Sequence, residues 1–138
     1  MKKILLALSL IGASIFATSA SAELARSDYE KAVEVVDAKA GSFAKGMIDN
    51  RPGDEGRRDA LLQALGAYQN VLMTGVDAQD DRLSRAAESA IVEATRWADI
   101  IKTTDGVMQM RPFWEQASKV LMSRLTIEEA FDLNVPQK

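Results

Sequence analysis

From Ser27 onward, apolar residues recur at alternating spacings of four and three, the period of one face of an α-helix. Ser27 and Glu30 have the spacing of a capping box, in which both side chains satisfy free backbone N–H groups at a helix start. We therefore predict a first helix from Ser27 to about Ile48. Gly41 and Gly46 are expected to bend or fray its last two turns, because glycine costs about 1 kcal/mol relative to alanine. The predicted buried positions are Tyr29, Val33, Val36, Ala40, Phe43 and Met47.

The same pattern predicts a second and a third helix. Residues 50–56 have the composition of a turn and lead into a helix over about 57–74, which would end with Gly75 in the left-handed conformation. Asp77 can cap the third helix, which would end before the break at 104–106. Buried positions would be Leu61, Leu65, Tyr68 and Leu72, backed by Ala64 and Val71, in the second helix. In the third they would be Leu83, Ala87, Ala90, Ala94, Trp97 and Ile101.

Pro112 is well placed as the first residue of a fourth helix, since proline is favoured in the first turn. Thr126 and Glu129 form a second capping-box pattern, which predicts a short fifth helix over about 127–133. No segment has the alternation of a strand. The sequence thus predicts an all-α protein, an antiparallel bundle of four helices with this short C-terminal addition. The buried face of the fourth helix would comprise Phe113, Ala117, Val120, Leu121 and Leu125.

Residues 1–22 have the pattern of a secretory signal peptide. Lys2 and Lys3 precede an apolar run, and Ala20-Ser21-Ala22 is a small-residue cleavage motif. The apolar run is shorter than the roughly 20 residues that a membrane-spanning helix needs. We expect cleavage before Glu23, no stable membrane insertion, and a single domain over 23–138 that works in the periplasm or is secreted.

Composition narrows the function classes. The chain has no cysteine and no histidine, which removes disulfides, thiolate metal sites, haem attachment and the commonest general base. The formal net charge is −3, and removal of the two signal lysines makes the mature domain more acidic. Nucleic acid and anionic lipid are therefore not expected as partners, because both bind basic surfaces. We expect no cofactor and no enzymatic activity.

One connection is unusually rich in side chains that bind partners. Met108, Met110, Arg111, Phe113 and Trp114 place thioethers, aromatic rings and a guanidinium within seven residues. Aromatic and arginine side chains dominate the binding energy of protein interfaces, so we predict a partner-binding patch here. Two alternatives remain open at this stage. The same side chains can pack in the core, and the two thioethers can bind Cu(I).

Two charged clusters are secondary candidates. Glu30, Glu34 and Asp37 lie on one stripe of the first helix, as a solvated surface or as a site for a basic partner. The second cluster surrounds the loop into the second helix and consists of Arg51, Arg57 and Arg58. These arginines can bind an anion, or they can pair locally with Asp54, Glu55 or Asp59.

Elimination leaves a binding function as the hypothesis for this sequence. We expect an exported, non-enzymatic helical domain that binds another protein, basic in character if the acidic stripe takes part. Such a domain could serve as an inhibitor, an immunity-type factor or an accessory subunit. The alternatives are a periplasmic holdase-like chaperone and a carrier of a small ligand or metal.

Overall fold

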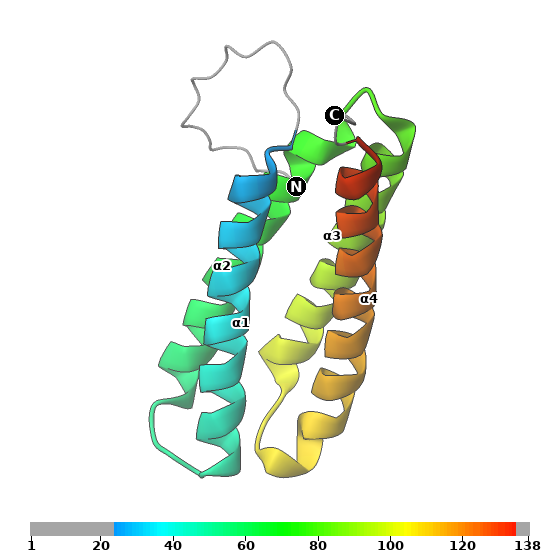
Figure 1. The fold of residues 1–138 in the computed structure, drawn as a ribbon. Coiled ribbons are helices and arrows are strands. Elements are labelled where there is room, and N and C mark those ends of the chain that lie inside the picture. Colours follow the sequence, from blue (N-terminus) through cyan, green and yellow to red (C-terminus); the bar gives the residue numbers. More distant parts are fainter. Residues whose placement is uncertain (1–23, 135–138) are drawn as a thin grey trace.

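The computed structural model describes residues 24–134, so the predicted signal peptide lies outside the described part. Four long helices alternate in direction, as Figure 1 shows: α1 (Arg26–Ile48), α2 (Asp54–Val76), α3 (Asp81–Thr103) and α4 (Met110–Asn134). A 3-10 turn, η3 (Val107–Gln109), precedes α4. The described residues contain no strand, and the predicted all-α bundle of four antiparallel helices is confirmed. None of these helices is long and apolar enough to span a bilayer.

The apolar positions that the spacing predicted for the first three helices are buried or half-buried, and α4 adds further side chains to the same core. Neighbouring helices in sequence pack against each other, and α1 closes the bundle against α4 through ring contacts, including Tyr29 with Phe131 and Phe43 with Phe113. Alanine lines the buried side of α3, which brings the neighbouring helices close. The largest fully buried side chains are Tyr29, Tyr68, Phe43, Phe113, Leu61, Leu65, Leu72, Ile101, Ile127, Val36 and Val120.

The buried face of α4 differs from the predicted one. Leu121 and Leu125 are 53% and 58% exposed, although hydropathy places them in the core. The buried line instead continues through polar side chains, among them Ser123 and Arg124, to Ile127. Arg124 enters the interior because its guanidinium pairs with Asp37 and lies over the Tyr68 ring, which hydropathy alone cannot predict.

The predicted capping box of α1 and both predicted ends of α2 are wrong. α1 begins at Arg26 without a side-chain cap, so the Ser27–Glu30 capping box does not form. α2 begins at Asp54, because Gly53 takes the left-handed conformation, with φ 94°, that starts this helix. Gly75 is not the left-handed end of α2 but a buried helical residue packed against Leu24 and Ala87, where a side chain would crowd its neighbours.

The predicted fifth helix is also wrong, because α4 continues without a break to Asn134. The Thr126 hydroxyl donates to the Met122 carbonyl one turn back, as threonine does inside a helix, and so does not cap a new one. Pro112 is the third residue of α4 and not the first. α1 likewise runs through Gly41 and Gly46 to its end at Ile48.

Candidate functional site

The predicted patch at the start of α4 is divided between core and surface. Met110 and Phe113 are buried, at 4% and 0% exposure, and so cannot face a partner. Met108, Arg111 and Trp114 are exposed, with Met108 at 91% and Trp114 at 49%. The sequence predicted a connection up to Pro112, whereas residues 107–109 form η3 and α4 begins at Met110. Neighbouring residues of a helix point to different sides, so some of these side chains face the core and others face solvent.

Phe113 shows why core packing explains part of this segment. Its ring centroid lies 5.6 Å from that of Phe43, 5.3 Å from that of Trp97 and 5.0 Å from that of Trp114. These contacts join α1, α3 and α4 at one level of the bundle. Such ring pairs stabilise the fold beyond their buried area, by about 0.5–1.5 kcal/mol each.

The two methionines of this segment do not form one surface. Met108 projects into solvent and Met110 packs in the core. A two-sulfur copper site needs both thioethers at one ion, so this arrangement gives the copper hypothesis no support. Over residues 24–134, no group of three or more Asp, Glu, His or Cys side chains is placed to hold a metal ion.

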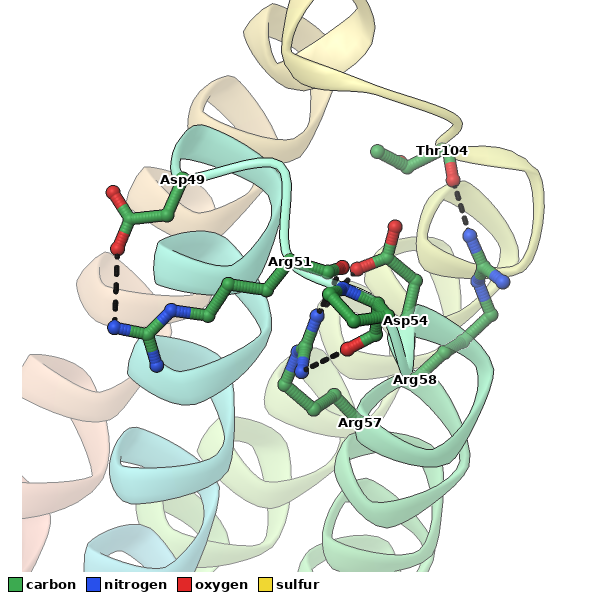
Figure 2. Close-up of polar contacts among 7 residues, drawn as sticks. Asp49, Arg51, Asp54, Arg57, Arg58 and Thr104 are labelled. Carbon is green, nitrogen blue, oxygen red and sulfur yellow. Dashed lines mark hydrogen bonds and ion pairs between the residues drawn. The ribbon is translucent and has the colours of Figure 1, made fainter.

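The arginines around the loop into α2 bind the protein itself (Figure 2). The Arg57 guanidinium donates to the Asp54 carboxylate at 2.6 Å and to the backbone carbonyls of Arg51 and Pro52. Arg51 pairs with Asp49 at 3.4 Å. The pairing of Arg57 with Asp54 is the local interaction that the sequence left open, and it occupies the fork that an anion would need.

Arg58 stabilises the far end of α3. Its guanidinium donates to the carbonyl of Ile101, in the last turn of α3, and to that of Thr104, the residue that follows the helix (Figure 2 shows the bond to Thr104). The same guanidinium lies 5.6 Å from the centroid of the Phe43 ring. Carbonyls at a helix C-terminus lack partners within the helix and carry partial negative charge, which a guanidinium satisfies. The three arginines therefore fix the loop and helix ends, and they do not converge on a free anion site.

The acidic stripe of α1 faces α4. Glu30 pairs with Arg26 at 3.6 Å, and Arg26 also reaches Asp132 of α4 at 2.9 Å. Asp37 accepts from Arg124 of α4 at 2.8 Å. The structure therefore places the stripe along the seam between α1 and α4, which spacing within one helix could not predict.

A polar cluster lies inside the bundle beneath this seam. The Tyr29 and Tyr68 rings are 6.2 Å apart between centroids, and the Arg124 guanidinium lies 5.8 Å from the Tyr68 centroid. Burial raises the pKa of Tyr68 against the lowering effect of Arg124. Burial also raises the pKa of Tyr29, and the neighbouring Tyr68 and Glu128 raise it further. Both hydroxyls therefore stay protonated at neutral pH.

Between α1 and α4 the surface is hollowed into a groove of about 360 Å³, called the α1–α4 groove below. Small residues on both helices, Ala40, Gly41 and Ala117, leave the space. Trp97 and Trp114 line it together with Leu121, and the ion pair of Asp37 with Arg124 spans it. The Nε1 of Trp97 and the Nε of Arg124 are buried and have no hydrogen-bond partner among the described residues.

Sequence reasoning missed most of this groove. The apolar pattern assigns Trp97 to the core alone and predicts that Leu121 is buried. No sequence motif or spacing pointed to Arg124. The available signal was the excess of apolar residues on α4, which exceeds what one buried face can hold. No protein-family model, curated protein or solved structure matches this chain.

Proposed function

We propose that this chain is an exported, non-enzymatic domain that binds another protein through its α1–α4 face, as an inhibitor, an immunity-type factor or an accessory subunit. The observation that supports this is a row of exposed apolar side chains along α4: Trp114, Leu121 and Leu125, at 49%, 53% and 58% exposure. Spacings of seven and four place them on one line of the helix. Contiguous apolar surface of this kind marks interaction sites on soluble proteins.

The chemistry of the groove favours binding over catalysis. Its walls are aromatic and aliphatic, and its charged groups, Asp37 and Arg124, neutralise each other at 2.8 Å. An ion pair of this kind joins two helices, whereas acid–base catalysis needs a group that is free to exchange a proton with substrate.

A pull-down from periplasmic and secreted fractions tests the proposal. The mature domain should capture a defined partner, and the Leu121→Ser, Leu125→Ser double variant should lose it, because truncating central interface contacts costs about 2 kcal/mol or more. Val92→Ser is the matched control, since Val92 is 47% exposed on α3 and does not line the groove. Equal capture by all three folded proteins would refute a role for the α4 row.

Trp114→Ala and Arg111→Ala separate the two exposed parts of the predicted patch. Arg111 lines a different hollow, with Met108, below the end of α3, whereas Trp114 lines the α1–α4 groove. Loss of the partner from Trp114→Ala but not from Arg111→Ala would assign binding to the groove. The reverse result would assign it to the hollow beside η3.

A holdase-like chaperone is the second candidate, because an open apolar groove is also what holds unfolded segments. This function predicts suppression of aggregation for several unrelated unfolded clients, whereas a specific binding domain protects none of them. The Leu121→Ser, Leu125→Ser variant serves both assays.

A further inference from the structure

The α1–α4 groove has two rims of different chemistry. The α4 rim is the apolar row of Trp114, Leu121 and Leu125, of which Trp114 and Leu121 line the groove. The α1 rim is the acidic stripe, of which Asp37 lines the groove, while Glu30 and Glu34 continue along the same face of α1 beyond it. A ligand that extends from the groove along the seam therefore meets apolar surface on α4 and carboxylates on α1.

Negative charge exceeds positive charge along this seam. Arg26 and Arg124 are the cations that bridge α1 to α4, and they pair with Glu30, Asp132 and Asp37. Glu34 is exposed and makes no ion pair with any residue in 24–134. Glu128 adds a further carboxylate on the α4 side, close enough to Tyr29 to act on it electrostatically. The charge left over after pairing is negative.

The shape of the groove suits a helix. Ala40 and Gly41 on α1 and Ala117 on α4 have little or no side chain, so the backbone of a bound segment can approach the floor closely. The Trp97 ring beneath them is 3% exposed and supplies an apolar floor. Recognition of amphipathic helices in grooves uses such an apolar floor, with anchors spaced by three and four residues.

We propose that the α1–α4 groove binds an amphipathic helix of another protein, whose apolar face packs on Trp114, Leu121 and Leu125 and whose lysine or arginine flank lies against Glu30, Glu34 and Asp37. This inference rests on the proposed function and names the chemistry of its partner. Charge complementarity selects this partner, because an acidic rim repels an acidic helix and attracts a basic one. A second copy of this chain would bring another acidic rim and a net charge of the same sign.

Peptide binding with a tryptophan readout tests the inference. Both tryptophans of the chain, Trp97 and Trp114, line the groove, so occupation changes the intrinsic fluorescence directly. Two helical peptides share one leucine-rich face and differ only in flanks, which carry lysine in one and glutamate in the other. The basic peptide should bind at least about tenfold more tightly, and the difference should shrink as salt screens the rim.

Variants assign the two rims separately. Leu121→Ser with Leu125→Ser should weaken the basic peptide by about tenfold or more, and Val92→Ser should leave its affinity unchanged. Glu34→Lys reverses one unpaired rim charge. This variant should bind the basic peptide about fivefold more weakly and the acidic peptide more tightly. Loss of folding could not produce such opposite changes. Circular dichroism of each variant verifies the fold.

The other outcomes separate this inference from the function on which it rests. Equal affinity for both peptides would overturn charge selection while leaving protein binding intact. Failure of both peptides, with a captured partner that requires Leu121 and Leu125, would overturn the helical basic ligand alone. Failure of both peptides and of the pull-down would overturn both proposals. A dimer of the free protein that the leucine variant dissociates, without peptide binding, would make a second copy the occupant.

Discussion

A glycine inside α1 is required by a side chain from the next helix. A Cβ atom on Gly46 would lie 2.2 Å from the Nε of Arg57, and Gly46 is itself buried. The guanidinium therefore packs directly on the α1 backbone, where it reaches Asp54 and the carbonyls of Arg51 and Pro52. The sequence suggested Gly46 as a weak point, whereas the structure shows a close approach.

Alanine substitution at Gly46 tests this contact, and the same substitution at Gly66 is the control. A Cβ atom on Gly66 of α2 would meet no atom within 4 Å, so Gly66→Ala should raise the free energy of unfolding by about 0.5–1 kcal/mol through helix propensity. The free energy of unfolding of the Gly46→Ala variant should be about 1–2 kcal/mol lower than that of the Gly66→Ala variant, because Arg57 must leave its partners. In an Arg57→Ala background, Gly46→Ala should become stabilising. Equal effects in both backgrounds, measured by urea denaturation, would contradict the packing.

Helix ends depend on single side chains that the periodic pattern does not identify. Asp80, not Asp77, precedes α3, and its carboxylate accepts from the backbone N–H groups of Arg82 and Leu83 at 2.7 and 3.2 Å. Asp80→Ala should lower the free energy of unfolding by about 0.5–2 kcal/mol. Asp77→Ala should change it by less than about 0.5 kcal/mol, since Asp77 is exposed. Denaturant midpoints decide between the two aspartates.

The other end of α3 is held from α2 by Arg58. Arg58→Ala should cost about 1.5–3 kcal/mol of unfolding free energy, because it removes two charge-assisted bonds to the Ile101 and Thr104 carbonyls. Arg85→Ala is the control, since Arg85 is 73% exposed and pairs with Asp81 one turn away. That change should stay within about 0.5 kcal/mol. A similar cost for both would show that the capping bonds contribute nothing.

Periodicity predicted the buried positions that repeat along each helix and missed the contacts between helices. The positions from Tyr29 to Met47 and from Leu83 to Ile101 follow one helical face, and the structure buries or half-buries them. α4 has apolar residues on two faces, so spacing could not decide which of them is buried. The buried face is the one that carries Arg124, whose ion pair and ring contact are with Asp37 and Tyr68 from distant parts of the chain.

At the scale of the whole molecule, the seam between α1 and α4 carries both the polar interior and the candidate site. Arg124 serves both, because it approaches the Tyr68 ring below the surface and spans the groove to Asp37 above it. The sequence identified Trp114 and the acidic stripe as separate candidates at different places in the chain. It could not show that closure of the bundle sets Trp114 on one side of a groove and Asp37, the last residue of the stripe, on the other.

The interior of this seam makes stability fall in alkaline solution. Tyr29 and Tyr68 are the only tyrosines of the chain, and burial raises the pKa of both above the unfolded value of about 10. Above about pH 10 the unfolded chain loses these protons while the folded protein keeps them, so the folded state binds more protons. Its free energy of unfolding then falls by about 1.4 kcal/mol per pH unit for each tyrosine, and the contribution is complete below that pH.

Two measurements test this expectation together. Urea midpoints should decrease above about pH 10 more steeply in the unmodified protein than in a Tyr29→Phe, Tyr68→Phe double variant, in which lysine titration remains but the tyrosine contribution is gone. Tyrosinate absorbance should appear only as the protein unfolds, because neither hydroxyl ionises inside the bundle. Tyrosinate formation near pH 10 in a protein that circular dichroism shows to be folded would mean that water reaches these hydroxyls. The interior of the α1–α4 seam at the level of Tyr29 and Tyr68 would then be open to solvent.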